Sequence, residues 1–428
     1  MTAHKTFGIP VTDNGEMTLR PIFSTNHRNA QVLQMSSLIV IDEAPMQHVN
    51  CLEMIDAFLR EIHGTPSLPF GKAVVLLCGD FGQLSPVTTL PGREAVLSVS
   101  IRSSPVFRHF THLHLVEPVR FSRDRIFAEF IDRLSDADGK DGVFSIVVPP
   151  QIYMTSRVDA ALQNLFAGFS HHVPKTQQDF VSLAQTPLYM SGVVAYTNDD
   201  IDFYNARVAD FVRTQIYGDD SSQKWQIPAH ESQSDEISGF ATPDLMESYT
   251  ANGVPPHILH LFSGAKVSLL RNYLPSRGLV NGAILIVIGR TLNTVTVMNI
   301  TPGSTFYGET ETIFRFTFKV SVKDMFSFNR HQFPLRLSYA ATVHRYQGDT
   351  ITGQMIFDLR CRSFAHGQLS VGMSRATCCA NVTLVVNPSD ETSRRVTGVM
   401  YRQLISDDSP YTLGDENEED FFDELGEE

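Results

Sequence analysis

The sequence lacks any hydrophobic run long enough to cross a lipid bilayer. A membrane-spanning helix needs about 20 consecutive apolar residues, and no segment of the 428 residues approaches that length. The first residues, MTAHKTFGIPV, also lack the apolar core of a signal peptide. We therefore expect a soluble, intracellular protein with no membrane partner.

Cysteine is scarce, and its spacing is uninformative for metal binding. The five cysteines form no C-x-x-C pair and no zinc-ligand spacing. This distribution offers no structural zinc site and favours a reducing compartment.

Basic residues are also fewer than acidic residues. The chain has 34 Lys and Arg against 47 Asp and Glu, a formal net charge of −13, which argues at first sight against a nucleic-acid partner. However, nine of the carboxylates lie in residues 413–428, which contain no basic residue. We expect this stretch to be an acidic disordered tail. It either keeps the protein in solution or mimics phosphate and competes for a basic groove.

Two apolar runs predict neighbouring strands of a parallel sheet. Residues 38–41 (LIVI) and 73–78 (AVVLLC) are rich in β-branched and aliphatic side chains, as in strands buried on both faces. Between them, residues 49–62 have apolar side chains at helical spacing. Strand, helix and strand together predict a right-handed crossover unit. A polar stretch at 217–236 predicts a loop or the boundary of an inserted domain.

Polar side chains directly follow both predicted strands. Asp42 and Glu43 end the first, and Gln83 lies in the segment GDFGQL after the second. Ligands of open parallel sheets bind beyond the carboxyl ends of the strands, so these side chains should share one crevice. Such a crevice suits phosphoryl transfer, with Asp42 on Mg²⁺, Glu43 orienting and deprotonating water, and Gln83 touching a γ-phosphate. The alternative for Asp42 and Glu43 is a helix-capping role at an ordinary strand end.

These motifs resemble the PIF-type (petite integration frequency) ATP-dependent 5′-to-3′ DNA helicases of superfamily 1, particularly the branch carried by Helitron transposons. The resemblance covers most of residues 2–390. It is carried by the strings TAHKTFGIPV, LIVIDEAPM, LLCGDFGQLSPV, HLVEPVRFSRD, AYTNDDIDFYN, GVPPHILHLFSGAKVSLLRNYLPSRGLVNG, FPLRLSYAATVHRYQGDTI and FAHGQLSVGMSRAT.

The resemblance implies an α/β fold with two RecA-like parallel-sheet lobes of the P-loop NTPase type. Residues 1–112 would form a first lobe that is truncated at its N-terminus. Residues 113–200 and 331–412 would form the second lobe, and residues 201–330 an insert containing a small β-barrel.

The resemblance also implies ATP and Mg²⁺ as cofactors and two arginine fingers. Arg120 and Arg375 fall on the family's two finger positions, and Gln347 and Gly348 on a nucleotide-binding motif. A guanidinium supplied from a second lobe can stabilise charge on a transferring phosphoryl group when the lobes close. The alternative for either arginine is a salt bridge at the surface.

Single-stranded and forked DNA are the implied partners. Thr342, His344 and Arg345 lie in the family's DNA-coupling motif, where side chains can reach a strand's phosphates. Thr342 is also suited to a core strand. The remaining DNA-facing positions are His4, Arg271, Asn272 and Asn281, each of which has a purely structural alternative.

One motif of the family is absent. The 428 residues contain no G-x-x-x-x-G-K-[ST] segment, which in the family precedes the TAH segment. Without that loop we expect no ATP hydrolysis by these residues alone, and a first lobe with unpaired strand edges that tends to aggregate. Arg345-Tyr346 replaces the family's usual Lys-Ser, and Tyr346 adds a ring that either stacks on DNA or obstructs it.

The function implied is an ATP-dependent DNA helicase in DNA repair, recombination, telomere maintenance or Helitron transposition, placed in the nucleus or else the mitochondrion. The alternative is an inactive, transposon-derived relic, or a DNA-binding or interaction protein that does not hydrolyse ATP.

Overall fold

The computed structural model describes residues 2–10, 19–88, 90, 92–115, 117, 119–233, 242–249, 251, 253–322 and 326–405. The chain divides into two compact units, which we call unit 1 (1–147, 362–374 and 395–428) and unit 2 (148–361 and 375–394). The domain boundaries expected from the sequence stay a prediction. No helix among the described residues is long and apolar enough to span a membrane.

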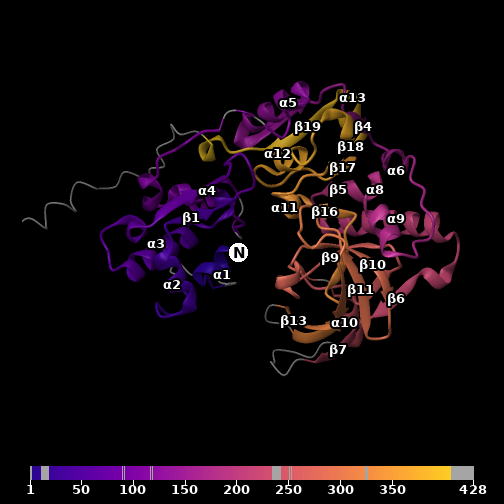
Figure 1. The fold of residues 1–428 in the computed structure, drawn as a ribbon. Helices are drawn as coiled ribbons and strands as arrows, with labels where there is room; N and C mark the ends of the chain where they lie inside the picture. Colours follow the sequence, from indigo (N-terminus) through magenta and orange to yellow (C-terminus); the bar gives the residue numbers. More distant parts are fainter. Residues whose placement is uncertain are drawn as a thin grey trace, which may run out of the picture. The chain divides into compact units, whose positions relative to one another are not determined.

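Unit 1 combines short helices with two small sheets (Figure 1). Its helices are α1 (Ala3–Phe7), α2 (Arg28–Met35), α3 (Val49–His63), α4 (Arg93–Val99), α5 (Arg125–Ser135) and α12 (Gln368–Met373). Its strands are β1 (Leu38–Ile41), β2 (Val74–Leu77), β3 (Val143–Val147) and β19 (Arg395–Val399). β1 and β2 pair in parallel, whereas β19 pairs with β3 in antiparallel fashion.

The predicted strand–helix–strand unit is present as β1, α3 and β2. Leu38 pairs with Val74 and Ile41 with Leu77, so the carboxyl ends of the two strands lie at the same edge. The apolar residues of α3 fall on one face because they recur at helical spacing, and Leu52, Ile55 and Leu59 are buried together with Ile39 and Ile41 of β1. This core fixes the edge where the polar side chains follow.

The prediction that β1 and β2 are buried on both faces is wrong. Leu38 and Val40 are 52% and 55% exposed, and Val74 and Leu76 on the adjacent strand are 61% and 43% exposed. The alternation arises because side chains of a strand point to opposite faces, and within the described part of unit 1 the core covers one face. The other face of this two-stranded sheet is apolar and open to solvent.

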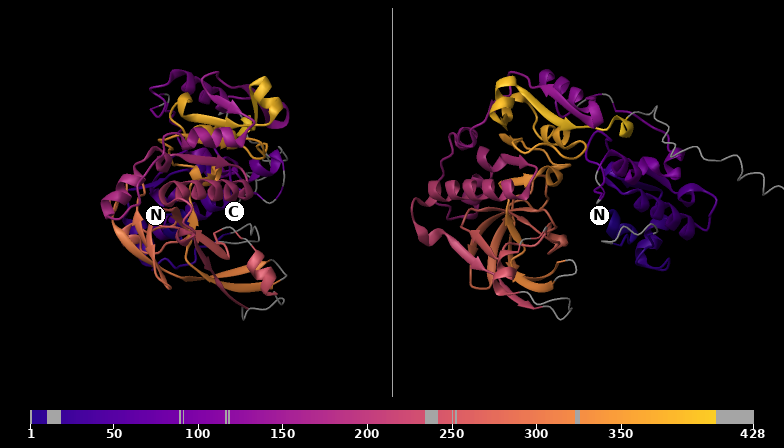
Figure 2. Two further views of the ribbon diagram at one scale, coloured as in Figure 1. Left: turned by 90° about the vertical axis from the view of Figure 1, so that its right-hand side faces the viewer. Right: turned by 180° about the vertical axis from the view of Figure 1, so that it is seen from behind.

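Unit 2 contains most of the strands (Figures 1 and 2). Its helices are α6 (Val158–Phe166), α7 (Gln177–Ala184), α8 (Pro187–Met190), α9 (Asn198–Tyr217), α10 (Pro243–Ser248), α11 (Val343–Tyr346) and α13 (Pro388–Ser393). Its strands are β4 (Tyr153–Thr155), β5 (Gly192–Ala195), β6 (Trp225–Pro228), β7 (His230–Gln233), β8 (Ile258–Leu261), β9 (Lys266–Leu269), β10 (Ile284–Arg290), β11 (Thr294–Asn299), β12 (Thr310–Phe314), β13 (Phe316–Val322), β14 (Phe326–Gln332), β15 (Leu335–Leu337), β16 (Ala340–Thr342), β17 (Met355–Asp358) and β18 (Val382–Val385).

A five-stranded parallel sheet forms the centre of unit 2, with strand order β16-β5-β17-β18-β4. Every residue of β5, β17 and β18 is buried, as expected for a parallel sheet covered by helices. α9 packs against β16 and β5 (Figure 1). Thr197 begins α9 by accepting a hydrogen bond from the Asp200 N–H at 3.2 Å. The predicted α/β class with a parallel sheet is confirmed.

In place of the expected small β-barrel, the described residues of this region form an open antiparallel sheet. Five antiparallel strands are ordered β12-β11-β10-β9-β15, and among the described residues β12 and β15 do not pair with each other. A barrel closes only when its edge strands pair, so this sheet is open, with β12 and β15 at its two edges in the described part of the chain. A separate three-stranded sheet, β13-β14-β7, lies at the lower end of this unit in Figure 1.

Residues 217–236, predicted to be a loop or the boundary of an inserted domain, contain two strands, so the loop alternative is wrong for these strands. β6 and β7 lie within this stretch, and β6 pairs with β8 from Trp225–Leu261 to Pro228–Ile258. These strands are polar because they are short edge elements with much of their surface exposed, so the apolar signal is weak. Residues 234–236 lie outside the described residues.

Candidate active site and DNA interface

The end of β1 places Asp42 and Glu43 at the edge of the sheet. The Glu43 N–H donates to Asp42 Oδ1 at 2.9 Å, which fixes the carboxylate against its own backbone. Glu43 has φ 52° and ψ 37°, a left-handed conformation that costs a non-glycine residue of order 1 kcal/mol or more. Such strain is retained when surrounding contacts hold it, as is common at functional sites.

The loops after β1 and β2 are hydrogen-bonded to each other. The Ala44 N–H donates to the Cys78 carbonyl at 2.9 Å, and the Cys78 N–H donates to the Ile41 carbonyl at 2.8 Å. Gly79 lies so close to Pro45 that a Cβ atom at Gly79 would be 2.3 Å from Pro45 Cδ. The two segments therefore form one surface at the end of the sheet.

Gln83 is held in this surface by a turn around Asp80. Asp80 Oδ1 accepts from the Gly82 N–H at 2.7 Å, and the Asp80 carbonyl accepts from the Gln83 N–H at 3.1 Å. The Gln83 Oε1 atom is buried and has no hydrogen-bond partner among the described residues. A buried polar atom without a partner calls for an explanation, and a bound ligand or its water shell would provide one. We call Asp42, Glu43 and Gln83 the strand-end cluster.

Within the described residues, the strand-end cluster offers carboxylate oxygens to a metal ion but not a complete set of protein ligands. Among the described residues, no group of three or more His, Cys, Asp and Glu side chains is placed to hold a metal ion. Mg²⁺ is commonly bound through one or two carboxylates together with substrate phosphates and water. Asp42 is exposed and supplies one such carboxylate.

Arg120 belongs to unit 1, and its side chain is exposed. Its Nη1 donates to the carbonyl of Ser374 at 2.9 Å, which ties it to the residue after α12. No ion pair involving Arg120 is present in the described part of the chain. The surface salt bridge that we considered as its alternative role is therefore not seen there.

Arg375 belongs to unit 2 and is only 2% exposed. Its Nη1 donates to the carbonyls of Tyr346 at 3.2 Å and Asp349 at 3.0 Å. These bonds bracket Gln347 and Gly348, so Arg375 holds the turn that carries both predicted nucleotide-binding residues. Partial burial raises the pKa of the Asp349 carboxyl, against the opposing effects of Arg345 and Arg375.

Three predicted DNA-facing residues lie together in unit 2. Asn272 Oδ1 accepts from the Asn281 N–H at 2.9 Å, and Arg345 Nη2 donates to the carbonyl of Gly282 at 2.9 Å. We call Asn272, Asn281 and Arg345 the amide–arginine cluster. It joins the loop around residues 272–282 to α11, which provides one surface from two segments distant in sequence.

The other predicted DNA-facing residues are more scattered. Thr342 and His344 flank the start of α11 in unit 2, and His344 is exposed although partial desolvation lowers its pKa. The Arg271 guanidinium lies over the Phe316 and Phe318 rings, 4.6 and 5.3 Å from their centroids. His4 is exposed on α1 of unit 1.

Tyr346 packs inside unit 2. A Cβ atom at Gly192 would be 2.4 Å from the Tyr346 hydroxyl oxygen, so the side chain lies against the start of β5. Burial also raises the pKa of Tyr346. The ring is thus used in packing rather than presented for stacking on DNA.

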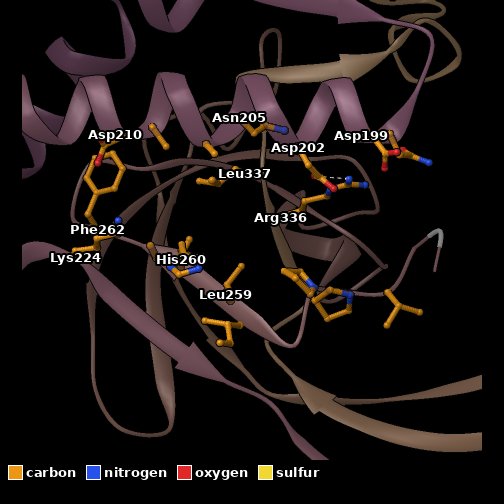
Figure 3. Close-up of a pocket in the computed structure, with 18 of the residues that line it drawn as sticks. Asp199, Asp202, Asn205, Asp210, Lys224, Leu259, His260, Phe262, Arg336 and Leu337 are labelled. Atoms are coloured by element: carbon orange, nitrogen blue, oxygen red, sulfur yellow. Dashed lines mark hydrogen bonds and ion pairs between the residues drawn. The ribbon is translucent and has the colours of Figure 1, made fainter. Parts of the chain in front are cut away.

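A separate cavity of about 700 Å³ lies in unit 2 between α9 and β8 (Figure 3). Asp202 on α9 forms an ion pair with Arg336 at 2.6 Å along one wall, and His260 and Leu259 of β8 lie opposite. None of the predicted site residues lines it. No sequence pattern indicated this cavity, because its residues come from four separated segments.

Two models of helicase families match parts of this chain. Residues 1–138 match the model of the PIF1-like helicase family, and residues 244–289 match the model of the DNA helicase Pif1 2B domain. The strand-end cluster lies in the first region, and Asn272 and Asn281 lie in the second. The resemblance to the PIF-type helicases is confirmed.

Individual relatives give the extent of the match. Human ATP-dependent DNA helicase PIF1 is 26% identical over 357 residues, which cover 79% of this chain and 44% of the human protein. The PIF4 helicase of Trypanosoma brucei brucei is 40% identical over 86 residues, 19% of this chain and 10% of that protein. The chain thus spans less than half the length of these curated relatives.

A crystal structure of Pif1 helicase from Bacteroides in complex with ADP-AlF3 and ssDNA has a TM-score of 0.60 at 21% identity and covers 95% of this chain and 82% of that chain. The Pif1 helicase of Candida albicans has a TM-score of 0.54 at 21% identity and covers 88% of this chain and 77% of that chain. The fold of this chain is that of the Pif1 helicases.

Proposed function

We propose that this chain provides the nucleotide-hydrolysing edge and the DNA-contacting surface of an ATP-dependent DNA helicase. The helicase would move 5′-to-3′ on single-stranded DNA and unwind forked duplexes. The observation that carries the proposal is the strand-end cluster, in which two carboxylates and an amide follow the carboxyl ends of two paired parallel strands within the PIF1-like region. The nucleus, or else the mitochondrion, is the proposed compartment.

The strand-end cluster has three of the groups that phosphoryl transfer uses: a carboxylate for a metal ion, a candidate general base and an amide. Bound Mg²⁺ would neutralise charge on the phosphates of ATP. Asp42 would hold the ion, Glu43 would orient and deprotonate the attacking water, and the Gln83 amide would contact the γ-phosphate. The left-handed backbone at Glu43 sets the direction of its carboxylate relative to Asp42. Fixed donors and acceptors of this kind need no reorganisation during the reaction.

The two proposed arginine fingers, Arg120 and Arg375, would have different roles. Arg120 is exposed and tethered by a single side-chain bond to Ser374, so its guanidinium can reach a phosphate with little structural cost. Arg375 holds the turn at Gln347 and Gly348. Its proposed contact with nucleotide would therefore also set the position of that turn.

The proposed DNA surface of unit 2 is the amide–arginine cluster with Thr342 and His344. Side-chain amides and arginines bind phosphate oxygens without reading sequence. The overall negative charge of the chain does not oppose this, because much of it lies in residues 413–428. Binding should therefore depend on salt and show little preference for base sequence.

Single-stranded DNA binding by Arg345→Ala tests this surface. Fluorescence anisotropy across a salt series should show weaker binding, and a log–log salt slope reduced by about 0.7 if one phosphate contact is lost. Arg207→Ala is the matched control, because Arg207 is another exposed arginine of unit 2 and pairs with Asp159 at 2.6 Å. Equal effects of the two substitutions, or binding that is insensitive to salt, would contradict the proposed surface.

A further inference from the structure

A buried histidine outside the predicted site contacts the loop that carries Gln83. His366 is 1% exposed and lies just before α12 in unit 1. Its Nε2 atom is 2.7 Å from the Phe81 carbonyl, two residues before Gln83. Its Nδ1 atom accepts from the Tyr401 N–H at 2.9 Å. One imidazole thus joins three segments that are far apart in sequence.

These two contacts fix the protonation state of the ring. Nδ1 accepts a hydrogen bond from a backbone N–H, so it carries no proton. Nε2 then carries the proton of the neutral ring and donates it to the Phe81 carbonyl. Neither contact can be made by an apolar ring of the same shape.

Gly367 brings the backbone of the same segment against Gln83. A Cβ atom at Gly367 would lie 2.3 Å from the Gln83 carbonyl oxygen and 2.9 Å from that of Gly82, and the residue has φ +72°. Its own N–H donates to the Val399 carbonyl at 3.0 Å. Only glycine allows this close approach without displacing the loop.

The Phe81 side chain is held independently of the histidine. Its ring meets the Phe107 ring edge-on at 5.8 Å, and the Arg102 guanidinium lies 5.0 Å from its centroid. The His366 ring stacks on Tyr401 with centroids 5.5 Å apart. The Phe81 backbone and side chain are therefore fixed by different partners, and the position of Gln83 depends on the backbone contact.

We propose that His366 and Gly367 are positioning residues that hold the Gln83 loop and carry movements of α12 to it. The proposal rests on the proposed function, in which Gln83 contacts the γ-phosphate. α12 begins at Gln368, directly after the contact, so a shift of this helix pulls on the Phe81 carbonyl and on the turn that carries Gln83. The Gln83 amide would then reach the phosphate only when α12 is in place.

Amide hydrogen exchange of the full chain tests the contact without nucleotide. His366→Phe keeps a ring on Tyr401 but removes both hydrogen bonds, whereas His366→Gln restores a donor near the Nε2 position and His366→Asn an acceptor near the Nδ1 position. We expect His366→Phe to speed exchange in residues 79–88 by about tenfold. His366→Gln should recover most of the protection and His366→Asn should not, while peptides of α3 exchange as in the wild type.

Two results would overturn the proposal. Unchanged exchange in the phenylalanine variant would show that the imidazole does not hold the loop. Equally fast exchange in all three variants would show that restoring a donor near the Nε2 position does not hold the loop. If His366→Phe loosens the whole of unit 1, Gly367→Ala provides the second test: faster exchange confined to residues 79–88 supports the proposal, and unchanged exchange there contradicts it.

The same exchange measurement, repeated with a nucleotide analogue, distinguishes a failure of this inference from a failure of the proposed function. The probe is ADP with Mg²⁺ and aluminium fluoride, which mimics a transferring γ-phosphate. For this arm the wild type and the variants are joined to a segment that carries G-x-x-x-x-G-K-[ST], because the 428 residues lack that phosphate-binding loop. Protection of residues 79–88 by aluminium fluoride beyond that given by ADP alone should appear in the wild type and in His366→Gln, and should be lost in His366→Phe. Absence of any nucleotide protection in the wild type would count against the proposed function, while the nucleotide-free comparison would still decide whether His366 holds the loop.

Discussion

The Ala44 N–H donates to the carbonyl of Cys78 at 2.9 Å, which joins the loop after β1 to the loop after β2. This bond continues the parallel pairing of the two strands beyond their ends. It brings the segment that carries Asp42 and Glu43 next to the segment that leads to Gln83. The geometry of the strand-end cluster therefore depends on how closely these two loops approach.

Gly79→Ala should disturb that approach. The added Cβ would lie 2.3 Å from Pro45 Cδ, and φ at this position is +152°, so we expect a loss of about 1–3 kcal/mol in the free energy of unfolding. Urea denaturation measures it. Gly64→Ala is the control, since its φ is +63° and nothing lies within 4 Å of an added Cβ. An equal or greater loss in the control would show that the contact with Pro45 does not matter.

The exposed face of β1 and β2 should be a source of aggregation. Val40 is 55% exposed and Ile41 is 5% exposed, although they are neighbours on one strand. We expect Val40→Lys to reduce light scattering severalfold on warming and to leave the free energy of unfolding nearly unchanged. Ile41→Thr, on the buried face, should lower that free energy by about 2 kcal/mol. Strong destabilisation by Val40→Lys would mean that this face is covered in solution.

The pattern of β1 shows what the sequence could and could not predict. An apolar run followed by Asp42 and Glu43 correctly predicted a parallel strand ending in a polar site, because β-branched side chains favour strands and strand ends collect polar groups. It could not predict which face is covered, since burial depends on elements elsewhere in the chain. The strand β7 was not predicted because its side chains are polar and mostly exposed, so it lacks the apolar pattern that indicates a strand.

Site residues were predicted by type and location rather than by contact. The motif strings marked Gln347 and Gly348 as nucleotide-binding positions, but nothing in their spacing indicated that Arg375 would be buried against the carbonyls on either side. His366 escaped notice because its partners, Phe81 and Tyr401, are remote in sequence. A sequence pattern does not indicate which backbone carbonyls and amides a side chain will bind.

Arg375 and Arg120 should differ sharply in their effects on stability. Arg375 is 2% exposed and bonds to two carbonyls, so Arg375→Ala should lower the free energy of unfolding by about 3 kcal/mol. Arg120→Ala should change it little because the side chain is exposed and donates one such bond. Chemical denaturation of both variants measures the contrast. Similar losses of unfolding free energy in the two variants would contradict the positioning role of Arg375.

Lys266 should make stability depend on alkaline pH. Its ammonium is buried and donates to the carbonyls of Tyr189 at 2.7 Å and Ser191 at 3.2 Å, and burial lowers its pKa to about 8 from 10.5. The folded state therefore releases this proton at lower pH than the unfolded state does. Stability from this group consequently rises as pH increases from about 8 to about 10.5.

Comparison of the wild type with Lys266→Met isolates this effect from the neighbouring tyrosines. Burial raises the pKa of Tyr339 to about 12, which acts with the opposite sign above pH 10 but remains in both proteins. Between about pH 7.5 and about pH 9.5, the wild type should gain about 2 kcal/mol of unfolding free energy relative to the variant. A constant difference across this interval would show that Lys266 keeps an ordinary pKa.

DNA-stimulated ATP hydrolysis, compared between the wild type and Glu43→Gln, tests whether the strand-end cluster is the site of hydrolysis. The 428 residues contain no G-x-x-x-x-G-K-[ST] segment, so the assay is run on the chain alone and on the chain joined to a segment that carries this motif. We predict turnover only in the joined chain, and a loss of about 100-fold or more in Glu43→Gln because the base is removed. Turnover by the joined chain that is unaffected by Glu43→Gln would contradict the assignment of the strand-end cluster as the site of hydrolysis.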